Sequence, residues 1–139
     1  MQAGELITWL NRAWDVEKEI KKLEKTNREV FDRLTAVTKD YDRIVVKSSP
    51  DPHKLDGIAA LDEKIVELID RKAAIHAETI EAIFLLEDRR YRAILYDRYV
   101  DQLKWETIMD TENYSKAHVF RLHRKAVAAL AAKLTETGD

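Results

Sequence analysis

The sequence predicts an all-α protein in which a long antiparallel helical hairpin, coiled-coil-like in its pattern, precedes a tri-helical helix-turn-helix unit. Three observations predict this fold class. The 139 residues include only 3 Gly and 2 Pro, 36% of them are charged, as in long amphipathic helices, and apolar residues recur at spacings of three and four. A chain of this length supplies one compact domain, or a small domain with a helical extension.

The first predicted element is one long helix that begins near Leu6. Its apolar stripe consists of Leu6, Trp9, Ala13, Val16, Ile20, Leu23, Val30, Leu34, Val37, Tyr41 and Ile44. These residues alternate spacings of three and four as in a heptad repeat, and such a helix cannot bury its stripe alone. Asn27 falls at an inward position of this pattern, where a polar side chain either specifies pairing with another helix or lies at the edge of a hairpin.

The second predicted element returns along the first after a break at residues 47–54, a segment that contains both prolines. Apolar residues then resume helical spacing from Ile58 to Leu86. The simplest arrangement is an antiparallel hairpin over residues 1–86. We expect this hairpin to form a homodimer through the N-terminal helices, or to dock on another partner.

Residues 87–134 contain three shorter helical patterns. Asp88 is a suitable N-cap for a helix with Tyr91, Ile94, Leu95 and Tyr99, and a short helix over Trp105 to Asp110 follows. The polar turn from Thr111 to Tyr114 leads into a final helix that runs from Ser115 to about Leu134. Residues 135–139 are expected to form a frayed tail.

The final helix carries the candidate functional face. Its spacing buries Val119, Leu122, Ala126 and Leu130 and leaves a basic face opposite, while Ser115 caps its first turn. Residues 1–86 have a net charge of −3, whereas Ser115 to Leu134 contain five Lys or Arg and no acid. Basic side chains on one helix face bind DNA phosphates and guanine edges, and apolar ones contact thymine methyl groups. The predicted DNA-binding residues are Ser115, Lys116, Ala117, Phe120, Arg121, Arg124 and Lys125.

The run from Leu95 to Leu130 contains RY, then W-E-x-I, then Y-S, then H-R-K-A. It resembles region four of housekeeping-type sigma factors, and more closely the phage-encoded RinA and ArpU-like late transcriptional regulators. The resemblance implies sequence-specific binding of double-stranded DNA and control of phage genes, and host RNA polymerase is a further candidate partner. Position by position, it implies base contacts from Lys116, Ala117, Phe120 and Arg121, with Arg124 and Lys125 nearer the backbone. Sigma factors have polar base-contacting side chains at the positions of Ala117 and Phe120. The resemblance therefore does not imply that this protein binds the promoter −35 element.

Other functions receive less support from the sequence. There is no cysteine, the four histidines are scattered, and no catalytic or phosphate-loop motif is present, so we expect no enzyme activity, cofactor or metal. No apolar run spans a bilayer, and we expect a protein of the bacterial host cytoplasm. Three alternatives stay open: a DNA-packaging protein like terminase small subunits, an RNA-polymerase-binding module, and a merely solvated basic helix.

Overall fold

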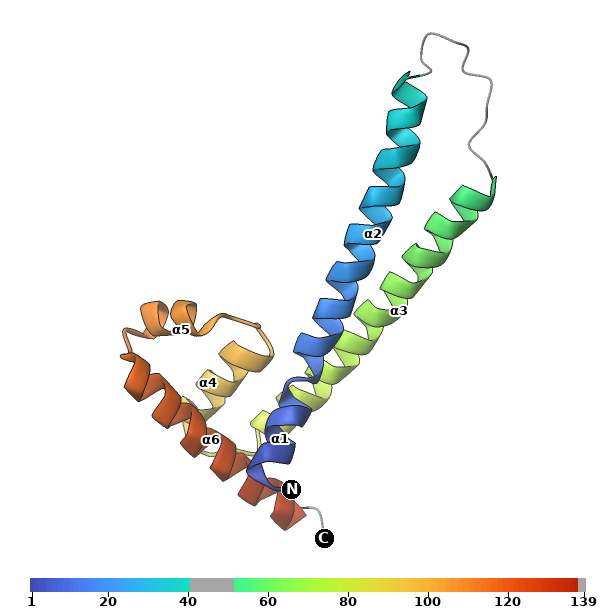
Figure 1. Ribbon diagram of the computed structural model, residues 1–139. Helices are drawn as coiled ribbons and strands as arrows, with labels where there is room; N and C mark the ends of the chain where they lie inside the picture. The colour runs from blue at the N-terminus through green and yellow to red at the C-terminus, as the bar shows by residue number, and fades with distance from the viewer. Residues whose placement is uncertain (41–51, 138–139) are drawn as a thin grey trace. The chain divides into compact units, whose positions relative to one another are not determined.

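The computed structural model describes residues 1–40 and 52–137, and every regular element in this part of the chain is an α-helix. The helices in chain order are α1 (Ala3–Leu10), α2 (Arg12–Asp40), α3 (Pro52–Ile83), α4 (Arg89–Tyr99), α5 (Trp105–Glu112) and α6 (Lys116–Thr137). Figure 1 shows two long helices, α2 and α3, and four shorter ones. The all-α prediction is therefore confirmed.

Contacts between residues divide the chain into two compact units. The hairpin unit is Val16–Arg71, and the core unit combines Met1–Asp15 with Lys72–Asp139. These bounds differ from the boundary between residues 86 and 87 that the sequence suggested. The chain enters the core unit at its N-terminus, leaves it for the hairpin, and returns at Lys72.

The hairpin unit is an antiparallel pair formed by α2 and α3. Val16 and Ile20 of α2 and Leu68 of α3 are its buried apolar residues among those described. Nδ2 of Asn27 donates a hydrogen bond to Oδ1 of Asp62 at 2.6 Å, so the polar residue of the stripe has its partner within the chain. Of the break predicted at residues 47–54, residues 47–51 lie outside the described residues, as do Tyr41 and Ile44 of the stripe. The prediction is wrong for residues 52–54, because α3 begins at Pro52, and proline is compatible with the first position of a helix.

The expected continuous helix from Leu6 to Ile44 is wrong at its start, because α1 ends at Leu10 and α2 begins at Arg12. The amide of the intervening Asn11 still bonds to the carbonyl of Ile7 at 3.0 Å. Leu6 and Leu10 are fully buried in the core unit. The apolar stripe thus packs in both units: Leu6 and Ala13 belong to the core unit and Val16 and Ile20 to the hairpin unit, and the interruption at Asn11 lies within the core-unit part.

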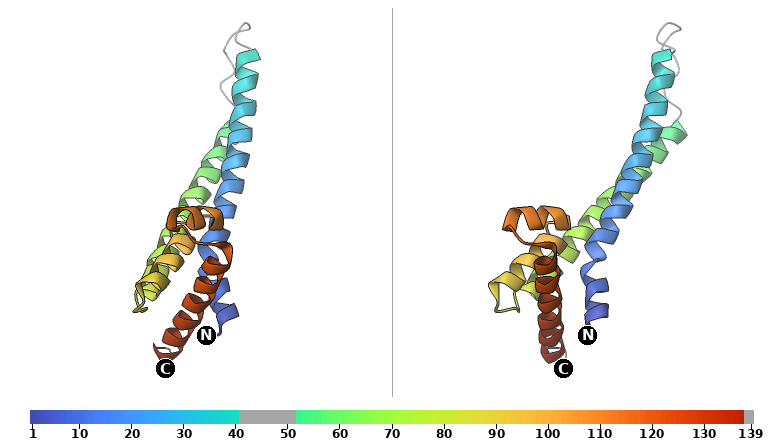
Figure 2. Two further views of the ribbon diagram at one scale, coloured as in Figure 1. Left: turned by 90° about the vertical axis from the view of Figure 1, so that its left-hand side faces the viewer. Right: turned by 60° about the vertical axis from the view of Figure 1, so that its left-hand side comes forward.

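The core unit is organised around α6, which packs against α1, α4 and α5. Figure 2 shows α1 and α6 side by side and α5 at the N-terminal end of α6. The fully buried large apolar side chains of this unit come from five helices and comprise Leu6, Leu10, Ile83, Leu95, Ile108, Val119 and Leu130. Helix α6 also extends to Thr137, past the expected end at Leu134, and the amino group of Met1 donates to Oγ1 of Thr135 at 3.3 Å.

Candidate nucleic-acid interface

Helix α4 provides the support for the candidate interface and begins where the sequence predicted. A carboxylate oxygen of Asp88 accepts a hydrogen bond from the amide of Arg90 at 2.8 Å, the geometry of a side-chain N-cap. The side-chain hydrogen bond from Arg90 lowers the pKa of this carboxyl. Ile94, Leu95 and Tyr99 of α4 are buried in the core, which fixes the helix beneath α5 and α6.

Helix α5 is two residues longer than predicted and ends in a left-handed turn. Asn113 has φ 57° and ψ 42°, a conformation that asparagine tolerates better than most residues. The amides of Asn113 and Tyr114 both bond to the carbonyl of Met109. Thr111 and Glu112 therefore belong to α5. The turn was predicted to span Thr111 to Tyr114, and in the structure it is two residues shorter.

Helix α6 begins after Ser115, as predicted. Oγ of Ser115 accepts a hydrogen bond from the amide of His118 at 3.1 Å, which satisfies one of the donors left open at a helix start. The predicted inward residues Val119, Leu122, Ala126 and Leu130 are all at most 5% exposed. The assignment of the inward face of α6 is therefore confirmed.

The opposite face of α6 is exposed and basic. Ala117, Arg121 and Lys125 follow one another at intervals of four residues and form one row, which Arg124 flanks; all four are exposed. Lys116 and Ser115 are exposed at the start of the helix. No acidic residue lies between Ser115 and Leu134, so a polyanion approaching this row meets no like charge from α6 before Glu136 in its last turn.

Phe120 lies differently from the other six predicted residues, because it is half-buried. Its ring packs against that of Trp105 with 5.1 Å between centroids. The side chain thereby joins α5 to α6 and presents only part of its surface to a ligand. The prediction that Phe120 belongs to the outer face is confirmed only in part, because Phe120 follows the buried Val119 by about 100° around the helix and so lies at the border between the two faces, where its ring packs against α5.

Behind the basic face lies a polar contact that the sequence reasoning missed. Oη of Tyr99 and Nε2 of His123 are 2.8 Å apart, and the His123 ring meets that of Trp105 edge-on at 5.0 Å. Burial, and then the charge of Arg98, lowers the pKa of His123 to about 4, while burial raises the pKa of Tyr99 to about 12. Both side chains are therefore neutral at pH 7. The contact could not be predicted from the sequence, because Tyr99 and His123 are 24 residues apart and lie on different helices.

A second contact that the sequence reasoning missed joins the N-terminal segment to α4 and α5. The guanidinium of Arg98 lies over the rings of Trp14 and Trp105, 4.5 and 4.6 Å from their centroids. Nε1 of Trp14 donates to the carbonyl of Arg98, and the guanidinium donates to the carbonyl of Leu103, both at 2.9 Å. Burial lowers the pKa of Arg98, and the two aromatic faces stabilise the cation. Arg98 therefore positions α5 rather than adding to the exposed basic face.

The described residues show neither a metal centre nor a membrane-spanning segment. No group of three or more His, Asp or Glu side chains is arranged there to hold a metal ion. None of the helices in this part of the chain is both long and apolar enough to cross a membrane.

Comparison with known proteins identifies a family for this arrangement. Residues 57–131, more than half of the chain, match the family described as "Protein of unknown function (DUF1492)", and the chain belongs to it. The matched region begins at residue 57, within α3, and ends at residue 131 of α6, and so includes every residue of the basic face. No curated protein and no solved structure matches the chain.

Proposed function

We propose that this member of the family is a sequence-specific DNA-binding protein that regulates transcription, with α6 as the helix that reads DNA. The observation that carries the proposal is the division of α6 into two faces. One face is buried in the core unit, and the other presents Lys116, Arg121, Arg124 and Lys125 with no acid among them. A helix of this kind, held by a preceding short helix across a tight turn, has the geometry of a major-groove reader.

The roles within this face follow from position along α6. Residues near the N-terminus of a recognition helix approach base edges, which assigns Lys116, Ala117 and Arg121 to the bases. Arg121 suits the O6 and N7 acceptors of guanine, and the methyl group of Ala117 suits a thymine methyl. Arg124 and Lys125 lie further along the helix and are assigned to phosphates. The contribution of Phe120 is mainly to hold α6 against Trp105.

The biological setting of the proposal rests on the resemblance of residues 95–130 to sigma region four and to RinA and ArpU-like regulators. On this basis we propose that the protein is a phage-encoded regulator that acts in the cytoplasm of a bacterial host. Host RNA polymerase is then the second partner. Crosslinking of the chain to polymerase without any DNA binding would instead favour a pure interaction module, and high-order rings in solution would favour DNA packaging.

The test is selection of binding sites from a pool of random DNA duplexes, followed by mobility-shift titrations at several salt concentrations. We expect Arg121→Ala to lower affinity for the selected site by about 1–3 kcal/mol and to relax preference at one base position. Lys125→Ala should weaken binding to all sequences and reduce the salt slope by about 1. Lys18→Ala, an equal charge change on α2, serves as the control.

Two outcomes would contradict this proposal. If selection enriches no sequence, the protein is not sequence-specific. If Arg121→Ala and Lys18→Ala bind the selected duplex equally well, α6 is not the reading helix.

A further inference from the structure

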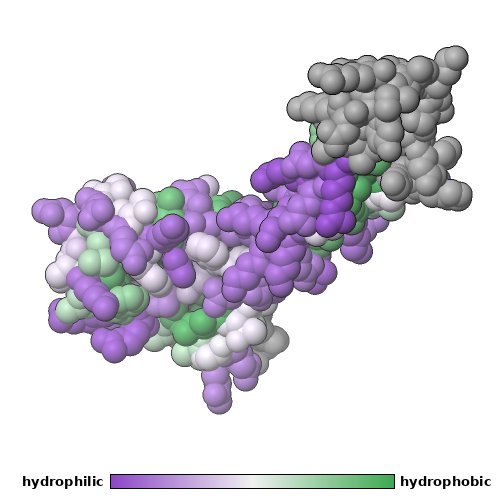
Figure 3. Space-filling model, turned by 45° about the horizontal axis from the view of Figure 1, so that its top comes forward, coloured by the Kyte–Doolittle hydropathy of each residue, from purple (hydrophilic) through white to green (hydrophobic). Residues whose placement is uncertain are grey.

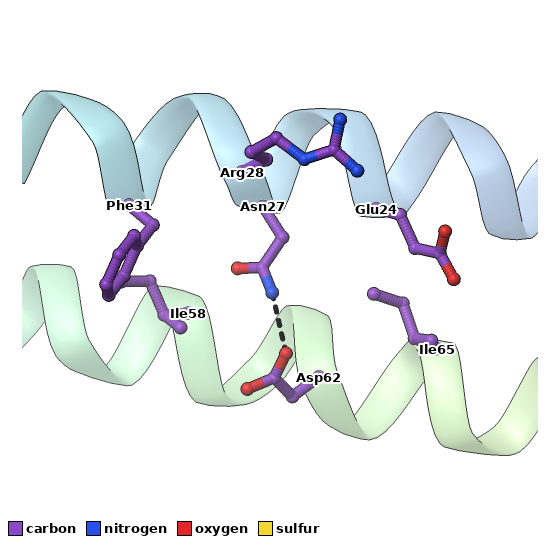
Figure 4. Close-up of a pocket in the computed structure, with 7 residues that line it drawn as sticks. All are labelled: Glu24, Asn27, Arg28, Phe31, Ile58, Asp62 and Ile65. Carbon is purple, nitrogen blue, oxygen red and sulfur yellow. Dashed lines mark hydrogen bonds between the residues drawn. The ribbon is translucent and has the colours of Figure 1, made fainter.

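Two pairs of polar side chains, one in each unit, differ in what their polar atoms contact. In the hairpin unit, where Figure 3 shows hydrophobic surface between charged side chains, Asn27 and Asp62 are joined by a hydrogen bond of 2.6 Å (Figure 4). In the core unit, the rings of Tyr114 and His118 meet edge-on with 4.6 Å between centroids. Within the described part of the chain, neither the Tyr114 hydroxyl nor the His118 ring forms a hydrogen bond or an ion pair. The second pair therefore keeps its donors for a ligand.

His118 lies at one border of the exposed face of α6. Successive residues of an α-helix are turned by about 100°, so His118 lies within about 20° of Lys125, whereas Phe120 lies on the other side of the face. Both border side chains are half-buried. Phe120 packs on Trp105, and His118 packs on Tyr114 of the preceding turn. The exposed face is thus bordered by an apolar ring on one side and by a polar pair on the other.

The turn before α6 holds this polar pair in place. The amide of Tyr114 bonds to the carbonyl of Met109 at 3.0 Å, and Oγ of Ser115 accepts from the amide of His118 at 3.1 Å. These bonds fix the backbone of both residues before any ligand arrives. Binding through the pair therefore requires little further ordering of the chain, and ordering is one of the main costs of association.

The charges around the pair suit an anion. Arg121 and Lys125 follow His118 one and two turns along α6. The nearest acids in the sequence, Asp110 and Glu112, belong to α5. Neither of these carboxylates forms an ion pair or a hydrogen bond with His118 in the structure, so the imidazole is not already engaged by a negative group.

The width of the major groove decides which part of DNA this border meets. A helix with its side chains is about 10–12 Å across, and the groove is about 12 Å wide, so a reading helix fills it. The middle of the exposed face then meets base edges, and the borders meet the sugar-phosphate walls. Tyrosine hydroxyls bind phosphate oxygens, and an imidazole N–H is a suitable second donor.

We propose that Tyr114 and His118 together bind one backbone phosphate of duplex DNA, on the groove wall that Lys125 also faces. This inference rests on the proposed function, because it takes α6 as the helix that enters the major groove. Phosphates are alike at every position of a duplex, so the pair contributes affinity and fixes the orientation of α6 without reading a base. Its role thus differs from that of Arg121.

The first experiment is mobility-shift titration of the full chain on the selected duplex and on an unrelated duplex, at several salt concentrations. His118→Ala and Tyr114→Phe should each weaken binding to both duplexes by about two- to tenfold, the effect of one lost hydrogen bond. His118→Arg places a fixed charge at the same border and should steepen the salt slope by about 1. Ala60→Arg adds the same charge at an exposed position of α3 and, as the control, should leave the slope unchanged.

The second experiment locates the contact on DNA with duplexes in which single phosphates are replaced by uncharged methylphosphonates. Wild type should lose affinity at one phosphate whose replacement no longer affects His118→Ala or Tyr114→Phe. Arg121→Ala should keep the sensitivity at that phosphate. A merely structural role for the pair would weaken binding without changing this pattern, and thermal unfolding followed by circular dichroism checks that each variant is folded.

The phosphate assignment is overturned if His118→Arg leaves the salt slope unchanged, if His118→Ala selects different bases, or if the pair variants keep the wild-type methylphosphonate pattern. It also fails if wild type binds no duplex. Should Arg121→Ala behave as expected while the pair variants do not, only the phosphate assignment fails. Should wild type bind without sequence preference and still pass both phosphate tests, the pair keeps its role and the sequence-specific function fails.

Discussion

The hairpin unit and the core unit use the same kind of amphipathic helix with different results. In the core unit, α6 is enclosed by α1, α4 and α5, and Val119, Ala126 and Leu130 have no exposed surface. In the hairpin unit, two helices cover only the sides that face each other, and Phe31 and Val66 are more than half exposed. The apolar stripe of a helix is thus fully buried only where several other helices pack around it.

The largest expected effect tests this contrast directly. Leu130→Ala should lower the free energy of unfolding by about 2–5 kcal/mol, since it leaves a cavity in a closed core. Ile69→Ala, at a side chain 48% exposed, should cost less than about 0.5 kcal/mol in the monomer. Urea denaturation at low and high protein concentration measures both values.

The dependence of these costs on protein concentration gives a second test. A cost of Ile69→Ala that grows with protein concentration would report burial against a second copy. Equal and large costs for Leu130→Ala and Ile69→Ala at every concentration would show that the contrast between the units is wrong.

An intermediate effect is expected from His123, whose pKa is about 4 in the folded core unit and about 6.5 in an unfolded chain. The unfolded chain binds the proton first, so stability is intact above about pH 6.5 and falls as the pH is lowered toward 4. By pH 5 the loss should be on the order of 1–2 kcal/mol. His123→Gln should remove this part of the pH dependence.

Tyr99→Phe is the matched variant for this measurement. It deletes the hydroxyl that contacts His123 but leaves the imidazole buried, and burial is the main cause of the lowered pKa. The pH dependence should therefore persist in Tyr99→Phe. Equal losses between pH 7 and pH 5 in wild type and His123→Gln would contradict the assignment.

The smallest expected effect concerns the start of α6. Ser115→Ala removes the oxygen that accepts from the amide of His118 and should cost about 1 kcal/mol, whereas Ser115→Gly should cost a few tenths. Thermal unfolding monitored by circular dichroism measures both. No difference between Ser115→Ala and Ser115→Asp, which preserves an acceptor, would show that the cap contributes nothing.

Much of the candidate site could be predicted from local sequence. Helix caps at Asp88 and Ser115 depend on side chains within three residues of the amides they accept from, and the left-handed turn depends on Asn113 itself. The inward face of α6 follows from helical periodicity. The exact ends of α5 and α6 were less predictable, because they depend on bonds and packing that form only when the turn closes.

Residues that act across the fold could not be predicted in this way. Trp14 lies next to Ala13 of the predicted stripe, and its side chain contacts Arg98, which is 84 positions away in the chain. Leu6 begins the predicted heptad pattern, but it is buried together with Leu10 in the core unit, in one cluster with residues of the C-terminal helix. Periodicity states which side of a helix is apolar, and it does not identify the surface that covers it.

The sequence by itself determined that this protein is helical, where α4 to α6 begin, and that α6 has one apolar and one basic face. These properties arise from hydrogen bonds within a few residues and from the 3.6-residue period of the helix. Only the tertiary structure decided that α1 belongs to the core unit, that Phe120 packs on Trp105, and that His123 is buried and neutral. Those outcomes depend on which distant surfaces meet, because burial and its effect on charge are properties of the assembled helices.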